Sequence, residues 1–445
     1  MKHPRKMKTS SCLKGKIKQN FEKFFDKQMI NRIGRASEFI CRKGAIITPF
    51  AFVLGLIQCC CGGWNTYSGW AAAIGTITGK EVSKQALFKG MNEHTVSFGR
   101  QLFEQVLKLR LKELKKGRVF KLFRRVLLAD STTLSLPQVL AKDFPGNVAH
   151  GVQKAVARLQ CILDLRAMQW LDVSLDAFTD NDQGASGKVV PLLKKGDLLI
   201  RDLGYFVLKV LKEIIGSEAF FISRLRYGLN WYAPGTGKQI NWKDVLPPKH
   251  RRVVDKRVMI GRDERVPVRV ILIPLPAQQV EQRIRKAKKD RDKRLHHGAA
   301  YYRWLSYHVF ITNVDKDTLS AREAAEVYGV RWQIELLFKA WKSGGHLQAV
   351  LHQGCTNVYR VKTIIYLLLV FYCLIIQQVY VRQFLSIEKS TGKLLSLIKL
   401  LAYVCNNLIK IISASVAKLK EILSRHCCYE QRNDRVNMIE FIYAL

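Results

Sequence analysis

Four polar side chains recur at helical spacing between residues 328 and 342. They are Tyr328, Arg331, Glu335 and Lys342. At about 100° per residue, this spacing places all four on one arc of an α-helix roughly 60° wide. A carboxylate that can bind a metal ion therefore lies among cations and a phenol that can bind phosphate. These are the groups that phosphodiester chemistry needs.

The helix that must carry these side chains has clear boundaries in the sequence. Ser320 and Glu323 have the spacing of a capping box, and Gly344 with Gly345 follows the last polar residue. The sequence therefore predicts one helix from Ser320 to Lys342. A neighbouring arc carries an apolar stripe that predicts burial, made of Val330, Ile334, Leu337, Phe338 and Trp341. Taken alone, such a segment is more often an ordinary amphipathic helix with solvated charges.

Two aspartates upstream favour the chemical interpretation. Apolar runs predict one β-strand that ends at Asp130 and another that ends at Asp202, and residues 159–178 between them predict an antiparallel hairpin. Acidic residues at strand ends lie where a sheet opens to ligands. We therefore expect Asp130, Asp202 and Glu335 to converge.

Three converging carboxylates raise one another's pKa, and divalent cations relieve this repulsion. Mg²⁺ prefers oxygen ligands. Two such ions about 3.5–4 Å apart can activate an attacking oxygen and stabilise a leaving one. The sequence has no Gly-rich phosphate loop of the P-loop type, which disfavours a nucleotide-hydrolysing motor.

The charge balance indicates a polyanionic partner. The 445 residues include 74 Lys and Arg against 35 Asp and Glu, a net charge of +39. DNA fits best, because each neutralised phosphate releases condensed counterions, while an anionic membrane surface is the competing partner. A single basic run is more often a solvated helix face, so the inference rests on the sum of the runs near residues 2–23, 108–125, 249–257 and 283–294.

Cysteine spacing and hydropathy predict a cytosolic protein. The eleven cysteines include no C-x-x-C pair, which favours reduced thiols over a zinc site or disulfides. The basic N-terminus is not followed by the apolar segment of a secretory signal. The longest apolar run, residues 364–376, is short for a membrane span and predicts a buried helix.

The order of elements predicts an α/β protein with a mixed sheet and helical regions at both ends. Within the N-terminal region, residues 78–116 indicate two helices joined near Asn92. They form either a helix-turn-helix that places Lys84 and Gln85 against DNA or a plain helical hairpin. The expected regions are a basic DNA-binding region (1–118), a first core part (119–226), a β-rich and basic insertion (227–306), a second core part (307–345) and a helical C-terminal region that is a candidate for dimerisation (346–445).

These motifs resemble the DDE transposases of bacterial insertion sequences. The residues ADST around Asp130, RDLGYF around Asp202 and the spacing Y-x2-R-x3-E-x6-K from Tyr328 to Lys342 match the Tyr-Arg-Glu-Lys (YREK) group, the insertion-sequence four family. The similarity extends from about Val82 to the apolar C-terminal helices. It implies a ribonuclease H-like catalytic core interrupted by a β-rich insertion.

The resemblance also implies a mechanism and its partners. Asp130, Asp202 and Glu335 would hold two Mg²⁺ or Mn²⁺ ions. Tyr328, Arg331 and Lys342 would bind phosphates near the element end. The implied activity is cut-and-paste transposition: endonuclease cleavage at terminal inverted repeats, with hairpin ends in some members, and joining of 3′ ends to target DNA. The implied partners are double-stranded DNA and a second copy in the synaptic complex, without a membrane, in the nucleoid of the bacterial cytosol.

A flipped base stacked on an indole is a further feature of this group. The candidate for that role is Trp304, with Tyr302 and Trp242 behind it. Three other hypotheses remain: a junction resolvase, a non-catalytic DNA-binding descendant of a transposase, and a basic membrane protein. The large insertion argues against a resolvase, whose core is compact, and the presence of all three acids gives no sign of catalytic decay.

Overall fold

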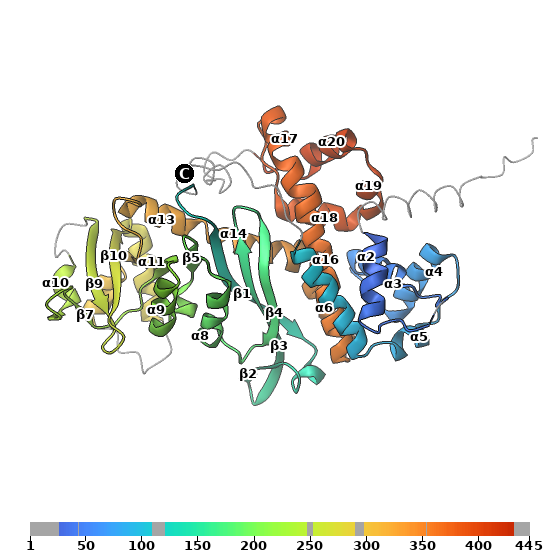
Figure 1. Cartoon of the computed structure of the whole chain (residues 1–445), viewed down its shortest axis with the longest axis horizontal. Coiled ribbons are helices and arrows are strands. Elements are labelled where there is room, and N and C mark those ends of the chain that lie inside the picture. Colours follow the sequence, from blue (N-terminus) through green and yellow to red (C-terminus); the bar gives the residue numbers. More distant parts are fainter. Residues whose placement is uncertain are drawn as a thin grey trace, which may run out of the picture.

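A mixed β-sheet extends from one end of the molecule to its middle, as the computed structural model in Figure 1 shows. The structure describes residues 26–42, 44–108, 121–246, 252–289, 298–352 and 354–430. Helices from the N-terminal region lie at one end, and long C-terminal helices lie between them and the sheet. The predicted boundary at residue 118 and the basic run at residues 2–23 lie outside the described residues.

Strand β1 (Val126–Leu136) is central to the sheet. It pairs antiparallel with β3 (Val152–Asp164) and parallel with β5 (Leu198–Arg201), which pairs parallel with β6 (Phe220–Arg224). Strands β4 (Gln169–Ala177) and β2 (Pro145–Ala149) pair with β3, so the predicted hairpin is confirmed.

Both faces of β1 are covered by apolar cores. Val126 and Leu128 belong to one buried cluster and Leu127 and Ala129 to the other, as the alternation of side chains along a strand requires. The helix α9 (Leu208–Gly216) contributes to the second cluster. The mixed α/β class is thus confirmed, and the strand order is consistent with a ribonuclease H-like domain.

The sheet continues beyond β6. Strand β11 (Tyr307–Thr312) pairs antiparallel with β6, and β10 (Val266–Pro274), β9 (Val254–Ile260), β7 (Trp231–Tyr232) and β8 (Gln239–Ile240) follow in that order. The strands of residues 227–306 therefore extend the core sheet. The same segment contains the helices α10 (Trp242–Val245), α11 (Ala277–Lys288) and α12 (Ala299–Trp304).

The described N-terminal helices are α2 (Lys27–Ala36), α3 (Pro49–Cys61), α4 (Tyr67–Thr78), α5 (Lys84–Lys89) and α6 (Glu93–Leu107). Asn92 caps α6, so the predicted junction near this residue is confirmed. Helix α5 begins later than the sequence suggested, because Ser83 caps it and residues 79–82 are not helical.

Helix α16 (Val358–Ile375) is the main buried helix of the C-terminal region. With a π-helical segment η5 (Ile376–Tyr380) and α17 (Val381–Thr391) it is long and apolar enough to span a membrane, but 83% of its most apolar window is buried inside the protein. The predicted buried helix is therefore confirmed. The other described helices of the C-terminal region are α15 (Leu347–His352), α18 (Leu397–Asn406), α19 (Leu408–Ser413) and α20 (Val416–His426).

The segment that carries Glu335 is not one continuous helix, so that prediction was wrong. It comprises α13 (Ala321–Gly329), α14 (Trp332–Lys339) and the π-helical segment η4 (Ala340–Gly344). The amides of Val330 and Arg331 bond to carbonyls three residues earlier, which tightens the chain at the junction. Gly329 is a weak helix former at that point. The capping box of Ser320 and Glu323 is present as predicted.

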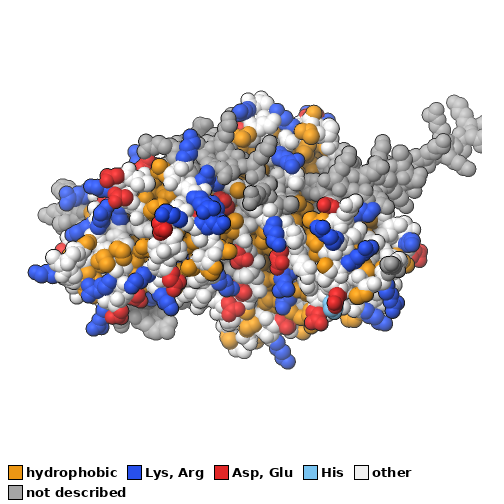
Figure 2. All heavy atoms as spheres, in the orientation of Figure 1, with side chains coloured by type: hydrophobic (Ala, Val, Ile, Leu, Met, Phe, Trp, Pro, Cys, Tyr) orange, Lys and Arg blue, Asp and Glu red, His pale blue; other side chains and the backbone are white. Residues whose placement is uncertain are grey.

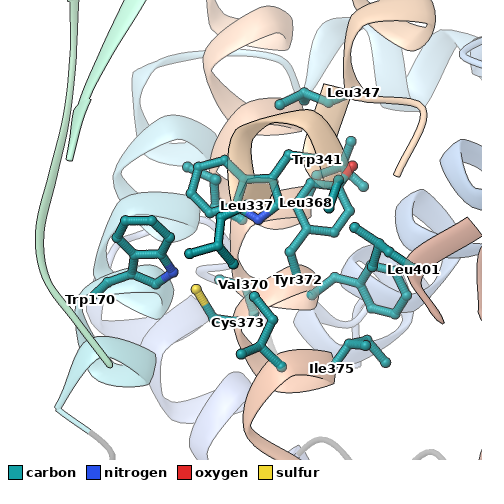
Figure 3. Packing of buried hydrophobic residues seen from close by; sticks show 14 of the residues in the cluster. Trp170, Leu337, Trp341, Leu347, Leu368, Val370, Tyr372, Cys373, Ile375 and Leu401 are labelled. Atoms are coloured by element: carbon teal, nitrogen blue, oxygen red, sulfur yellow. The ribbon is translucent and has the colours of Figure 1, made fainter. Parts of the chain in front are cut away.

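A cluster of buried aromatic side chains packs against the segment that carries Glu335, on its buried face (Figure 3). The Trp341 ring lies 4.9 Å from the Trp170 ring of β4 and 6.3 Å from the Tyr372 ring of α16, between ring centroids. All five residues of the predicted apolar stripe are buried. The Tyr372 hydroxyl donates a hydrogen bond to the carbonyl of Gly345 at 2.7 Å. The helix that presents Glu335 is thus anchored to both the sheet and the C-terminal helices.

Candidate active site

The strand register places the two aspartates side by side. The parallel pairing of β1 with β5 ends at Ala129 opposite Arg201, so Asp130 and Asp202 occupy the next position on each chain. The sequence predicted that the first strand ends at Asp130, and this was wrong. Strand β1 continues beside β3 to Leu136. What ends at Asp130 is the pairing with β5. The sheet therefore opens between the two carboxylates.

Arg331 links the third carboxylate to the first. Its Nη1 donates to Asp130 Oδ2 at 2.8 Å, and its Nη2 lies 2.5 Å from Glu335 Oε1. Arg331 lies at the tightened junction between α13 and α14, and Glu335 follows one turn later on α14. The three side chains are partly buried. The exposed fraction is 14% for Asp130, 17% for Arg331 and 33% for Glu335. One guanidinium thus bridges two acids that come from different elements, and its single positive charge offsets only one of their two negative charges.

Tyr328 completes the cluster from the side of Asp202. Its hydroxyl donates to Asp202 Oδ1 at 3.2 Å, and the guanidinium of Arg224 lies 5.6 Å from its ring centroid. Burial, followed by the charge of Asp202, raises the pKa of the Tyr328 phenol to about 12. The phenol therefore remains a neutral hydrogen-bond donor at physiological pH.

The electrostatics of the site centre on Asp130. Burial raises the pKa of its carboxyl from the usual 3.8 to about 6. The amide of Ser131 and the charge of Arg331 lower this pKa, while the negative charges of Asp202 and Glu335 raise it. The site therefore holds more negative charge than Arg331 offsets, a condition that favours a bound cation.

This pKa predicts how unfolding depends on pH. The folded state binds more protons than the unfolded chain between pH 4 and 6, so the contribution of Asp130 to stability is greatest below about pH 4 and declines as pH rises through 6. In metal-free buffer, Asp130→Asn should therefore gain stability relative to the wild type as pH rises from 4.5 to 7.5. Thermal unfolding across this range checks the result, and a difference that does not vary with pH would contradict it.

Lys342 does not join the acids directly. Its Nζ lies 3.5 Å from the carbonyl oxygen of Thr133 on β1, and burial lowers the pKa of its amine. The predicted common arc assumed regular helical pitch from Tyr328 to Lys342. The tightened junction and the wide η4 turn change that pitch, so Lys342 lies further along β1 than Asp130.

Trp304 packs among aromatic side chains of residues 227–306. Its side chain is 8% exposed, and its ring centroid lies 5.6 Å from that of Tyr227 and 5.3 Å from that of Trp242. It lines a pocket of about 370 Å³ that also includes Leu203, Arg224, Arg283 and Lys286. Tyr302 is half-buried in α12 beside it. Base stacking by Trp304 stays a prediction.

A second pocket, next to the acids, was not predicted. Its volume is about 360 Å³, and its lining includes Tyr328, Arg331, Arg224, His308 and Trp332. Trp332 directly follows Arg331 and is 52% exposed. Its position outside the predicted apolar stripe was the sequence signal that this side chain would not be buried in the core.

The predicted DNA-contacting residues of the N-terminal region lie far from this site. Lys84 and Gln85 are exposed on α5, at the opposite end of the molecule from the insertion strands in Figure 1. Figure 2 shows that Lys and Arg side chains are distributed over the whole visible face and do not form a single patch.

The three carboxylates are chemically suited to bind a divalent metal ion, but in this structure they are not arranged around a common ion position. Within the described part of the chain, no three His, Cys, Asp or Glu side chains are close enough together to hold an ion. Arg331 lies between Asp130 and Glu335, and Tyr328 occupies one oxygen of Asp202. The donors are all carboxylate oxygens with surplus negative charge, which suits Mg²⁺ or Mn²⁺.

A mixed sheet with two adjacent aspartates and a helix-borne glutamate defines the DDE class of transposase domains. The family model described as "Transposase DDE domain" matches residues 121–374, more than half of the chain, and the chain belongs to this family. The match contains Asp130, Asp202 and Glu335, and it begins after the N-terminal helices.

Known relatives are transposases of insertion sequences. The chain is 27% identical to the transposase of element IS231F from Bacillus thuringiensis subsp. israelensis, over 60% of each chain. It is 28% identical to that of IS231D from Bacillus thuringiensis subsp. finitimus, over 63% of this chain and 62% of the relative. It is 25% identical to that of IS1151 from Clostridium perfringens, over 74% and 73%. The chain thus spans about 60% of the first of these relatives.

Proposed function

We propose that the protein is a transposase that binds the terminal inverted repeats of an insertion sequence, cleaves the DNA there and joins the freed 3′ ends to target DNA. The observation that carries the proposal is the register of Asp130 beside Asp202, with Glu335 linked to Asp130 through Arg331. Three carboxylates from separate elements at one sheet opening are costly for folding alone, and a metal-dependent reaction accounts for them.

Asp130, Asp202 and Glu335 would hold the metal ions, which when bound polarise the scissile phosphate and lower the pKa of an attacking water or hydroxyl. The protein's own residues orient the DNA strand. Arg331 can exchange a carboxylate for a phosphate, because its planar guanidinium suits both anions. Tyr328, as a neutral donor, can hydrogen-bond a phosphate oxygen without adding charge.

The pocket beside Tyr328 supports a hairpin step at the element end. A tight DNA hairpin forces a terminal base out of the stack, and that base needs an aromatic face and cations near its phosphate. Trp332 and His308 offer aromatic faces there, and Arg224 offers a cation. Trp304 in the adjoining pocket remains the alternative stacking residue.

The same proposal includes the partners. The net charge of +39 supports binding of double-stranded DNA, with the exposed Lys84 and Gln85 on α5 as contacts for the repeat. Joining two element ends requires two active sites, so a homodimer forms in the synaptic complex, with residues 346–445 as the candidate contact. The protein acts in the bacterial cytosol, at the nucleoid. The buried character of α16 supports a location without a membrane.

The direct test uses the DNA that flanks the reading frame. Labelled duplexes that end in the flanking inverted repeats, incubated with the purified protein and Mg²⁺ or Mn²⁺, should be cut at the repeat boundary and yield a 3′-hydroxyl. A circular target plasmid should then gain the labelled end. A scrambled repeat is the control. Binding of the repeats without cutting in either metal would instead favour a non-catalytic DNA-binding protein.

A further inference from the structure

A fourth acid, Asp182, is linked to Asp130 through Ser131 and is not part of the motifs that identify the family. It is the first residue of the short helix α8 (Asp182–Ala185), and its side chain is 25% exposed. Three donors converge on its Oδ1: the Ser131 hydroxyl at 2.8 Å, Arg158 Nη1 at 2.8 Å and Gln160 Nε2 at 3.1 Å. This oxygen is therefore fully used by the protein itself.

The contact through Ser131 connects Asp182 to the first aspartate. The Ser131 amide donates to Asp130 Oδ1 at 2.8 Å, while its hydroxyl donates to Asp182. Arg158 also donates to the Ser131 hydroxyl at 3.1 Å, which fixes the orientation of that hydroxyl. One serine thus bonds to both acids, through its backbone amide to Asp130 and through its hydroxyl to Asp182.

The other oxygen of Asp182, Oδ2, lies near the turn that follows the second aspartate. The turn Leu203–Tyr205 begins directly after Asp202, and Asp182 packs against it at Gly204. A Cβ atom at Gly204 would lie 3.0 Å from Asp182 Oδ2, closer than an ordinary contact, so the carboxylate closely approaches this turn. The Tyr205 hydroxyl donates to Gln160, which donates to Asp182. The turn after Asp202 is therefore held to the same acid.

We propose that Asp182 is a positioning residue that sets the separation of Asp130 and Asp202 for a shared divalent metal ion. This inference rests on the proposed function, because only a shared ion gives that separation a use. Oδ1 of Asp182 is bonded to three protein groups and Oδ2 lies against the turn at Gly204, so Asp182 acts through the other two aspartates. Such outer partners of carboxylate ligands typically contribute about 10- to 100-fold to metal affinity.

The test measures Mn²⁺ affinity of the full-length protein without DNA, by electron paramagnetic resonance and calorimetry. Asp182→Asn keeps the shape but removes the charge that pairs with Arg158, and should weaken Mn²⁺ binding by about 10- to 100-fold. Ser131→Ala removes only the connecting hydroxyl and should weaken it in the same direction. Asp176→Asn is the matched control, because Asp176 is 20% exposed and pairs with Lys188 outside this network.

The outcomes separate the inference from the function it rests on. Mn²⁺ affinity within twofold of wild type in both Asp182→Asn and Ser131→Ala overturns the positioning role, even where cleavage of element ends is intact. Wild-type protein that binds Mn²⁺ but cuts no element end overturns the proposed function alone. Wild-type protein that binds no Mn²⁺ overturns both. If Asp182→Asn does not fold, Ser131→Ala decides, because it leaves the ion pair with Arg158 in place.

Discussion

Glu335→Gln, Asp130→Asn and Asp202→Asn should each reduce cleavage of the element end by roughly a thousandfold or more while the protein still binds that end. Each change removes one negative oxygen donor from the cluster but keeps the size of the side chain. Loss of a metal contact in the transition state costs several kcal/mol, and each 1.4 kcal/mol is about tenfold in rate. Single-turnover cleavage and a gel-shift assay of the same end measure the two quantities.

A matched control lies on the neighbouring helix. Glu326 pairs with Arg322 one turn earlier on α13 and contacts none of the three acids, so Glu326→Gln should cleave as the wild type does. Retained cleavage in Glu335→Gln would remove this residue from the site. Loss of end binding along with cleavage would indicate that the acids act through folding, which circular dichroism of each variant would detect.

The adjacency of Asp130 and Asp202 could be predicted from sequence because it depends on strand order. Parallel strands that are neighbours present equivalent positions at one edge, so Asp130 and Asp202 meet once their strands are assigned correctly. The burial of the apolar stripe could also be predicted, since the burial of Ile334, Leu337 and Trp341 follows from helical periodicity alone.

Departures from regular pitch could not be predicted in this way. The chain tightens at Val330, directly after Gly329. The wide turn at residues 340–344 lies where Gly344 closely approaches the Ile398 carbonyl on α18, so that a Cβ there would lie at 2.9 Å, and such a tertiary contact is not visible in a local pattern. The burial of Trp304 could not be predicted for a similar reason, while its role in base stacking stays a prediction. Its burial depends on Tyr227 and Trp242, which approach it only when the strands of residues 227–306 join the sheet.

Arg331→Ala should have opposite consequences with and without metal. Without metal, the change leaves Asp130 and Glu335 close together without their shared cation, which costs about 1–3 kcal/mol and lowers the unfolding temperature by several degrees. With saturating Mg²⁺, the ion replaces the guanidinium and most of this loss should be recovered. Cleavage should still fall roughly 10- to 100-fold, because a charge-assisted phosphate contact is lost.

Two further variants isolate the role of this guanidinium. Arg331→Lys keeps the charge but cannot bridge two carboxylates with one planar group, so it should restore stability more than cleavage. Arg322→Ala removes an exposed arginine of α13 and should change neither. An equal loss of unfolding temperature with and without Mg²⁺ would mark Arg331 as a purely structural residue. The expected metal-dependent recovery would instead mean that Arg331 occupies the position of the cation until metal and DNA arrive, and then turns to the phosphate.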